Sequence, residues 1–383
     1  MPLKLRPAVV SDAPALTEIL HRAKASWGYP DHLMAEFRKH WQISEATIRS
    51  LTMTVAERGG TPVAFSGVTR QDATTLLIDF LFVQPELHGQ GIGALLLTRA
   101  EDRARQEGLT RLYLESDAHA APFYERRGFR TIATRPSEMS PGKDIPLMER
   151  PLSPGVHKVS ALNIRISKTP WSFEAAHERE ILDHFEEARK RIALLWNGRT
   201  LKLTGYRFED GVFNGTCTEC SFAAYLAWRD WGAPDSSAFN LFGSAILRAA
   251  DGALLYGVMS DRTATGGMIY PPGGNLDPTD LQADGKVDVV GAIYRELEEE
   301  TGLTRDDVEA RDLLVAFDGP RISVGLVMEL DRSAEDLRDA IMRHSTASPE
   351  QELADVRIMR TRADLEDPAV VPYARAVGRY LLS

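Results

Sequence analysis

The chain has 383 residues, a formal net charge of −10, a hydrophobic share of 43% and a charged share of 26%, which are ordinary values for a globular protein. No apolar run approaches the roughly 18 residues needed to cross a bilayer, so a membrane partner is excluded. The acidic balance also argues against nucleic acid as a partner, because proteins that bind the phosphate backbone concentrate positive charge.

A chain of this length exceeds what one hydrophobic core organises, so two domains of roughly 150 to 200 residues are expected. The N-terminal residues contain no apolar stretch of the length that a secretory signal needs. Two cysteines, Cys217 and Cys220, cannot build a disulfide framework, and we expect a cytoplasmic protein. Their isolated C-x-x-C spacing could mark half a zinc site or a redox pair, but two unlinked thiols are the favoured interpretation.

Hydrophobic periodicity predicts an ordered series of elements in the first part of the chain. The series is a strand at 3–8, helices at 12–25 and about 30–48, strands at 52–58, 61–70 and 74–83, a helix at about 92–107, a strand at 110–116, a short helix near 121–127 and a strand at 129–136. The following segment, 137–156, holds four prolines and should be extended, so the domain boundary is placed near residue 153.

The second part of the chain opens with a long polar helical pattern. The predicted order is a helix at 174–196, a glycine-rich hairpin region to about 216, strands at 239–249 and 253–261 around Asp251-Gly252, an acidic helix at about 288–301, two more strands and a closing helix near 372–382.

The acidic helix carries the clearest chemistry. Positions three and four apart share one face of a helix, so Glu296, Glu299 and Glu300 should converge while Leu297 turns toward the core. Carboxylates packed this closely repel one another, and Mg²⁺ or Mn²⁺ would remove the repulsion and bridge them to substrate phosphates. Gly302 stands where a helix-ending glycine belongs.

This run resembles the Nudix signature R-E-U-x-E-E-x-G-U, in which U is a bulky aliphatic residue. The matching positions are Arg295, Glu296, Leu297, Glu299, Glu300, Gly302 and Leu303. The resemblance implies that Glu299 and Glu300 are metal ligands, that Glu296 is a ligand or the base, and that Arg295 orients the carboxylates. It also implies a metal-binding backbone carbonyl at Gly273, and a nucleoside diphosphate linked to another group as substrate.

The sequence departs from this pattern before the helix. The pattern has a glutamate eight residues before the arginine, where this chain has Val287 with Asp288 beside it, and the loop is about seven residues longer than usual. Asp288 is the candidate substitute, and Glu350 and Glu352 are weaker candidates for a further ligand or base. The alternative is an ordinary solvated acidic helix. The stretch 201–225 resembles the leading subdomain of Nudix enzymes that hydrolyse UDP-sugars.

A glycine-rich loop, HGQGIGA, precedes the helix predicted at 92–107. Its glycines let the backbone approach a ligand closely, and the free N–H groups at a helix start bind pyrophosphate. A dinucleotide fingerprint is one interpretation, because Gly89, Gly91 and Ala94 fit the spacing and Glu115 follows about 20 residues on. Four residues separate the preceding strand from this loop, however, and three antiparallel-looking strands come before it, which argues against that interpretation.

The order of elements over residues 3–150 resembles the GNAT acyltransferases, whose loop Q/R-x-x-G-x-G/A is represented by His88, Gly91 and Gly93. The resemblance implies acetyl-CoA as cosubstrate, bound at Val83, His88, Gly89, Gln90, Gly91, Ile92, Gly93 and Ala94. It also identifies Tyr124, in SDAHAAPFYERRGF, as the residue that protonates the departing CoA thiolate; a core aromatic is the alternative.

A general base must accept the proton of the acceptor amine. Asp79 is our candidate, because it is an acid in an otherwise apolar strand, where an unpaired charge is costly. Glu115 is the alternative, and a water relay would need neither residue. Trp27 and Tyr29 could line the acceptor pocket or pack in the core.

Together these patterns predict an α/β (α+β) protein with two domains. Residues 1–152 would be a GNAT N-acyltransferase with a mixed, mostly antiparallel sheet, acting on a small-molecule amine. Residues 153–383 would be a Nudix hydrolase with an α/β/α sandwich and a leading subdomain at about 160–235. The alternative is that one domain, more readily the Nudix half, is a non-catalytic nucleotide sensor that regulates the other. The sequence does not indicate the oligomeric state.

Overall fold

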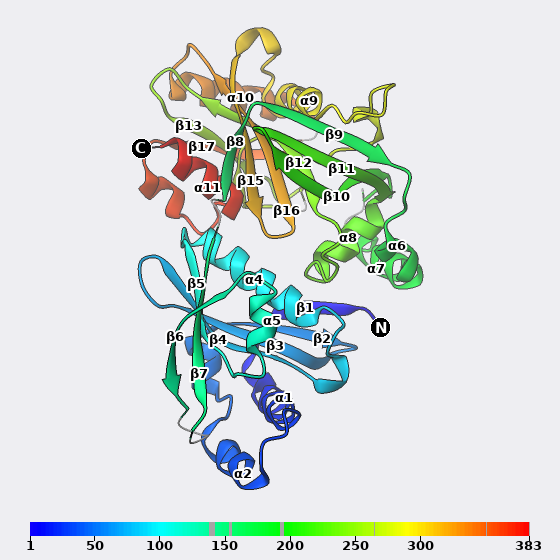
Figure 1. Ribbon diagram of the computed structural model, residues 1–383. Helices are drawn as coiled ribbons and strands as arrows, with labels where there is room; N and C mark the ends of the chain where they lie inside the picture. The colour runs from blue at the N-terminus through cyan, green and yellow to red at the C-terminus, as the bar shows by residue number, and fades with distance from the viewer. Residues whose placement is uncertain (138–141, 153–154, 192–194, 264, 350, 383) are drawn as a thin grey trace. The chain divides into compact units, whose positions relative to one another are not determined.

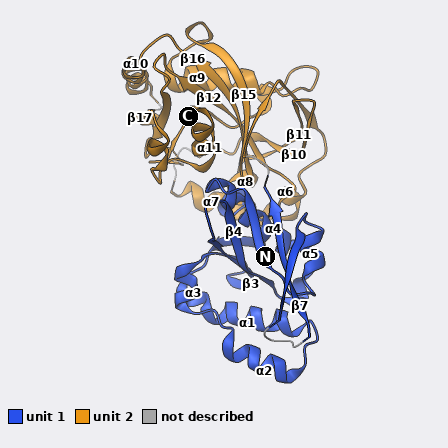
Figure 2. Cartoon of the chain, turned by 60° about the vertical axis from the view of Figure 1, so that its left-hand side comes forward, with its two compact units in different colours: residues 1–154, 228–234 blue, residues 155–227, 235–383 orange. Residues whose placement is uncertain are grey.

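A computed structural model describes residues 1–137, 142–152, 155–191, 195–263, 265–349 and 351–382. The chain divides into two compact units, drawn in different colours in Figure 2. Unit 1 consists of Met1–Pro154 and Trp228–Pro234, and unit 2 consists of Gly155–Ala227 and Asp235–Ser383. Unit 1 therefore differs from the predicted first domain by a short segment from much later in the sequence.

Unit 1 is built on one seven-stranded sheet with the strand order β1-β2-β3-β4-β5-β7-β6 (Figure 1). Its strands are β1 (Leu3–Pro7), β2 (Thr52–Arg58), β3 (Thr61–Arg70), β4 (Thr75–Val83), β5 (Arg111–Glu115), β6 (Arg130–Pro136) and β7 (Asp144–Pro151). Its helices are α1 (Ala13–Ala25), α2 (Asp31–His40), α3 (Glu45–Ser50), α4 (Ile92–Gln106) and α5 (Ala121–Glu125). Every neighbouring pair is antiparallel except β4 with β5.

Apolar side chains cover both faces of this sheet. Leu16 and Leu20 of α1 belong to one core cluster with Phe65 of β3. Leu97 of α4 belongs to another, with Leu112 of β5. The two clusters hold the helices on the sheet and leave the ends of β4 and β5 to form a site.

The segment Trp228–Pro234 adds to the β1 edge of unit 1. Leu5 N–H donates to the Trp231 carbonyl oxygen at 2.8 Å. The Arg99 guanidinium of α4 donates to the carbonyl oxygens of Gly232 at 2.8 Å and Ala233 at 3.0 Å. These bonds tie both an edge strand and the first helix after the glycine-rich loop to a distant part of the chain.

Unit 2 has two sheets. A three-stranded sheet has the order β10-β11-β9, and a larger sheet has the order β14-β13-β12-β16-β15-β8, with β17 paired to β13. The strands are β8 (Val156–Val159), β9 (Ala161–Ser167), β10 (Arg199–Glu209), β11 (Val212–Ser221), β12 (Asn240–Arg248), β13 (Leu254–Met259), β14 (Ile269–Tyr270), β15 (Glu309–Asp318), β16 (Arg321–Glu329) and β17 (Leu353–Met359). The helices are α6 (Ser172–Ala176), α7 (Glu178–Arg189), α8 (Phe222–Asp230), α9 (Val289–Thr301), α10 (Ala334–Ala347) and α11 (Pro372–Leu381).

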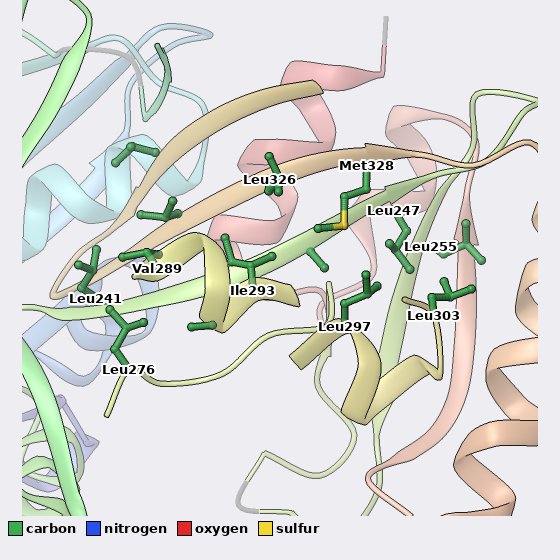
Figure 3. Close-up of a cluster of buried hydrophobic side chains, with 14 of the residues drawn as sticks. Leu241, Leu247, Leu255, Leu276, Val289, Ile293, Leu297, Leu303, Leu326 and Met328 are labelled. Atoms are coloured by element: carbon green, nitrogen blue, oxygen red, sulfur yellow. The ribbon is translucent and has the colours of Figure 1, made fainter. Parts of the chain in front are cut away.

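The larger sheet carries helices on both faces. Ala245 and Leu247 of β12 share a core with α9 and α10, while Ile246 between them shares a core with α11. This alternation follows from the strand period of two. Figure 3 shows Ile293 and Leu297 of α9 among the leucines of the first core.

The predicted fold class is confirmed, because helices pack on mixed sheets in both units. Several elements differ from prediction. The helical stretch at 30–48 is two helices, since Ser44 begins a new one by accepting the Thr47 N–H at 3.0 Å. The polar helix at 174–196 is α6 and α7, which ends at Arg189. Helices α8 and α10 and strands β7, β8 and β9 were not predicted. No helix in the described ranges is long and apolar enough to cross a membrane.

Candidate active sites

The strands β4 and β5 of unit 1 separate soon after they meet. Their parallel pairing covers three residue pairs and ends at Leu77 with Tyr113. Asp79 has no partner on β3, although the residues on either side of it do, so it is the extra residue of a β-bulge. A bulge bends a strand and re-aims its side chains. The sheet is therefore open between the two strands beyond Leu77.

A cavity of about 380 Å³ lies at this opening, a size suited to a small molecule. Its described walls include residues 77–82 of β4 and residues 113–117 of β5 and the turn after it. The walls also include four aromatic residues that precede the sheet's second strand, Trp27, Tyr29, Phe37 and Trp41. The sequence weighed Trp27 and Tyr29 as pocket or core residues, and the structure places both at the cavity.

Tyr124 reaches the cavity from α5. Its ring is buried, with Phe123 at 5.1 Å and Phe129 at 5.6 Å between ring centroids. Burial raises the pKa of the Tyr124 hydroxyl. The hydroxyl therefore stays protonated at neutral pH, which is the state required of a proton donor.

Asp79 and Glu115, the two candidate bases, both line the cavity but differ in their partners. Glu115 is paired with Arg135 at 2.7 Å. Asp79 accepts a hydrogen bond from the Thr69 hydroxyl at 2.8 Å. Partial burial raises the pKa of Asp79. The Arg135 guanidinium engages the Glu115 carboxylate, whereas a neutral hydroxyl contacts Asp79, so Asp79 is the stronger candidate for the base.

The glycine-rich loop begins α4 in an open environment. Gly91 occupies the N-cap with φ +80°, and Gly89 has φ +78°, a region that favours glycine. A Cβ atom on either residue would meet nothing within 4 Å. The first turn of a helix leaves backbone N–H groups without intrahelical partners. These N–H groups, from Ile92 onward, are therefore available to an anion such as a pyrophosphate.

Two residues of the predicted CoA-binding set contact each other. His88 Nε2 lies 3.1 Å from the Val83 carbonyl oxygen, so Nε2 carries the proton and donates it. The imidazole therefore holds the loop to the end of β4. The Gln90 side chain accepts a hydrogen bond from Arg58 at 3.0 Å.

Lys24 and Asp117 form a pair at the cavity that the sequence did not indicate. The Lys24 ammonium contacts the Asp117 carboxylate and lies 5.0 Å from the Trp27 ring centroid and 4.9 Å from that of Tyr29. Asp117 also accepts from the Tyr29 hydroxyl at 2.7 Å and from the His119 N–H at 2.9 Å. Burial raises the pKa of Asp117, but the Lys24, Tyr29 and His119 hydrogen bonds outweigh that effect and lower it.

Helix α9 of unit 2 places the predicted acidic residues around the loop at Gly273. Val289, Ile293 and Leu297 bury one face of the helix, as Figure 3 shows. The helix ends at Gly302, which adopts φ +71° and closes it as the sequence predicted. This anchoring fixes which carboxylates turn toward the loop.

Arg295 contacts two of the three glutamates. Its guanidinium lies 2.7 Å from Glu296 and 3.5 Å from Glu299. The Glu299 side chain is 56% exposed, whereas Glu296 lies against Gly274, where a Cβ atom would come within 2.3 Å of its carboxyl carbon. Burial raises the pKa of Glu296 to about 7. A side chain at position 274 would therefore displace the Glu296 carboxylate from its present position.

Glu300 is buried beside the same loop. One carboxylate oxygen accepts the Gly273 N–H at 3.0 Å, and the other, Oε2, is buried with no hydrogen-bond partner in the described structure. Burial raises the pKa of Glu300 well above its usual range. The carbonyl oxygens of Pro272 and Gly274 accept N–H groups of β12, but that of Gly273 accepts from no described backbone N–H. A buried bare oxygen and a free carbonyl fit a hard cation.

The carboxylates are not gathered as a complete metal site. Within the described ranges, no group of three or more His, Cys, Asp or Glu side chains is close enough to hold an ion. The Glu299 carboxylate contacts the Arg295 guanidinium instead. The donors that already face the loop are Glu296, Glu300 and Gly273.

Neither Val287 nor Asp288 brings a carboxylate to the candidate site in place of the glutamate of the Nudix pattern. Val287 is buried in the core of unit 2. Asp288 is the N-cap of α9, and its carboxylate accepts the Gly291 N–H at 2.9 Å. A capping carboxylate satisfies the helix end. The suggestion that Asp288 substitutes at the site therefore has no contact to support it.

The remaining candidates lie around or away from this loop. Repulsion by the Glu352 carboxylate adds to burial in raising the pKa of both Glu296 and Glu300. Glu350 lies outside the described residues. Cys217 and Cys220 are buried free thiols, and burial raises the pKa of each to about 12, so neither is a thiolate at neutral pH.

Comparison with known proteins gives matches in the N-terminal part. Residues 14–129 match the model of the acetyltransferase (GNAT) family. An acetyltransferase of Agrobacterium fabrum, Atu2258, is 36% identical over 76 residues, which is 20% of this chain and 55% of that protein. The chain thus spans about half the length of this curated relative.

Solved structures of acetyltransferases are also similar. The PaiA N-acetyltransferase of Thermoplasma acidophilum, in complex with coenzyme A, is 18% identical with a TM-score of 0.34; the match covers 39% of this chain and 99% of that one. The ribosomal-protein-S18-alanine N-acetyltransferase of Escherichia coli is 22% identical with a TM-score of 0.31, covering 40% of this chain and 95% of that one. These values are too low to carry an argument about substrate.

Proposed function

We propose that the GNAT acetyltransferase domain in unit 1 transfers an acetyl group from acetyl-CoA to the amine of a small molecule. The observation that carries this proposal is the cavity opened by the divergence of β4 and β5, with Asp79 and Tyr124 in its walls. The open glycine-rich loop at the start of α4 supports it, because its N–H groups suit the pyrophosphate of CoA.

The residues of unit 1 divide the proton transfers between them. Acetyl-CoA supplies an activated thioester carbonyl. Asp79 accepts the proton that the acceptor amine loses as its nitrogen bonds to the acetyl carbon, and Tyr124 donates a proton to the departing sulfur. Asp79 can accept a proton only when it is ionised, which requires a pH above its raised pKa. Tyr124 can donate a proton only when it is protonated, and burial favours that state by raising its pKa.

The test is release of the CoA thiol by the full chain supplied with acetyl-CoA and a panel of small-molecule amines. At least one amine should become acetylated, and Tyr124→Phe should slow the transfer while leaving acetyl-CoA binding intact. An unchanged rate in Tyr124→Phe would remove that residue from the proposal. Failure to bind acetyl-CoA at all would remove the transferase function.

A second function, metal-dependent hydrolysis of a nucleoside diphosphate compound, is proposed for unit 2. It is favoured by the buried Glu300 Oε2, which has no hydrogen-bond partner in the described structure. Glu296, Glu299, Glu300 and the Gly273 carbonyl would hold Mg²⁺ or Mn²⁺, with Glu296 as the alternative base. The ion would polarise a phosphate oxygen and acidify a bound water. Arg295 orients Glu296 and Glu299.

The test is a screen of ADP-sugars, UDP-sugars, NAD(H) and diadenosine polyphosphates with and without Mg²⁺. Glu300→Gln should abolish any metal-dependent product release, as should Glu299→Gln. Glu298→Gln is the matched control, because Glu298 lies on the same helix and is exposed. Retained activity in both test variants would contradict the assignment. Nucleotide binding without turnover would instead support the sensor alternative.

A further inference from the structure

The loop between Gly274 and α9 makes a seven-residue excursion, residues 281–287. The two ends of this hairpin are paired, because Leu281 and Val287 form an antiparallel bridge. Inside it, Gln282 N–H donates to the Lys286 carbonyl oxygen at 2.8 Å. The chain thus leaves and returns at the same place.

The hairpin lies on the free edge of the three-stranded sheet of unit 2. Ile166 N–H donates to the Gly285 carbonyl oxygen at 3.0 Å, and Val287 N–H donates to that of Ile164 at 2.9 Å. Both partners belong to β9, an edge strand. These hydrogen bonds extend the sheet and account for the extra length of the loop.

Because the ends of the hairpin meet, the residues that flank it are neighbours. Asp288 N–H donates to the Asp280 carbonyl oxygen at 2.8 Å. Asp280 precedes Arg295 by 15 residues, and by eight once the seven residues 281–287 are left out. Eight is the separation at which the Nudix pattern has its glutamate. The acid that corresponds to that glutamate is therefore Asp280 rather than Val287 or Asp288.

The contacts of Asp280 agree with this assignment. Its side chain is 5% exposed, and one carboxylate oxygen lies 3.3 Å from the Arg295 guanidinium. The other oxygen accepts the Asp277 N–H at 3.0 Å, which fixes the carboxylate in place. Arg295 in turn lies 2.7 Å from Glu296. A chain of charged contacts runs from Asp280 through Arg295 to the candidate site.

We propose that Asp280 is a positioning residue for the hydrolase site, holding Arg295 so that Arg295 orients Glu296 and Glu299. The proposal rests on the hydrolase function proposed for unit 2. Partners that orient metal ligands typically change metal affinity or activity by 10- to 100-fold when they are replaced. Asp288 is the matched control, because Asn can replace Asp as a helix N-cap.

The activity test compares three variants of the full chain. Asp280→Asn should lower kcat about tenfold or more with little change in KM. Asp280→Glu, which restores a carboxylate, should recover most of that loss, and Asp288→Asn should stay close to the unchanged chain. A lowered kcat in Asp288→Asn together with an unchanged kcat in Asp280→Asn would overturn the proposal and assign the role to Asp288.

A second readout does not need turnover. The full chain is titrated with Mn²⁺, and free Mn²⁺ is measured by electron paramagnetic resonance. Asp280→Asn should weaken Mn²⁺ binding about tenfold, while Asp288→Asn leaves it unchanged. Equal affinity in Asp280→Asn and the unchanged chain would overturn the positioning role even if no hydrolysed substrate is found.

If the unchanged chain binds no Mn²⁺, the proposed hydrolase function fails, and the coupling of Asp280 to Arg295 is read from stability. Thermal unfolding of Asp280→Asn, Arg295→Gln and the double variant forms a mutant cycle. Non-additive shifts in Tm support the contact, and additive shifts overturn it.

Discussion

Asp79 combines three properties at one residue: it occupies a bulge, it lines the cavity, and its carboxylate accepts a hydrogen bond from the neutral hydroxyl of Thr69. A general base acts only when deprotonated. Because partial burial raises the pKa of Asp79, we expect acetyl transfer to fall as the pH drops through a value above the usual range of aspartate.

The corresponding variant is Asp79→Asn. It should lower kcat/KM for the acceptor by roughly 10²-fold or more and remove the loss of activity on the acidic side of the pH profile. Glu115→Gln, the control, should keep that acidic limb. An acidic limb that persists in Asp79→Asn and disappears in Glu115→Gln would transfer the role to Glu115.

Asp117 is expected to matter for stability. Its side chain and that of Lys24 are largely shielded from water, and three donors converge on the carboxylate. Asp117→Asn leaves the shielded Lys24 ammonium without a counter-charge and should destabilise unit 1 by about 1–3 kcal/mol. Urea denaturation measures the change. Glu45→Gln, which removes a partner from the exposed pair with Arg49, should cost at most about 0.5 kcal/mol.

The sequence was informative for single residues wherever the chemistry is local. The run from Arg295 to Gly302 was predicted correctly as a helix that ends at a glycine, because the helical period and the helix-ending glycine are both local signals. Lys24 and Asp117 are 93 residues apart and meet only in the folded sheet, so no local pattern reveals them. Asp280 was not identified from the sequence, because the hairpin at 281–287 lengthens its separation from Arg295 beyond the eight residues of the Nudix pattern.

At the scale of elements, strands and helices with a strong period were predicted within a few residues of their observed ends. The exceptions have physical reasons. The stretch at 30–48 contains Ser44, whose side chain caps a new helix. Helix α10 also begins at a serine, Ser333, which accepts the Asp336 N–H, and this N-cap was the available sign of it.

The loop that begins α4 supports a prediction at this scale. Gly91→Ala places a side chain at φ +80° and should raise the KM for acetyl-CoA about tenfold, because the strained backbone re-aims the first N–H groups of α4. Gly60→Ala is the matched control, since Gly60 has φ +79° in equally open space at the β2–β3 turn. It should cost similar stability, about 1 kcal/mol, without changing the KM for acetyl-CoA. Equal KM values in both variants would contradict a CoA-binding role for the loop.

At the scale of the whole molecule, the sequence indicated two domains but not that both are discontinuous in sequence. Trp228–Pro234 belongs to unit 1 and supplies the carbonyl acceptors for Leu5 and Arg99. A boundary drawn from prolines near residue 153 could not show this, because composition reports linkers and not distant backbone pairing.

The consequence is that a fragment ending at residue 154 should be less stable than unit 1 in the full chain. In the fragment, Leu5 N–H and the Arg99 guanidinium lose their acceptors, each worth about 0.5–1.5 kcal/mol when satisfied. Calorimetry of the fragment and the full chain measures the difference. Identical transitions for unit 1 in both would show that the segment 228–234 contributes nothing to its stability.

The measurement that tests the central claim most directly is CoA thiol release by the full chain, with acetyl-CoA and the amine panel, recorded across pH for the unchanged chain and for Asp79→Asn. We predict acetylated amine and stoichiometric CoA from the unchanged chain, with the acidic limb lost and the rate lowered in Asp79→Asn. Thiol release that is independent of every amine and unaffected by Asp79→Asn would contradict an acetyltransferase site at the opening between β4 and β5.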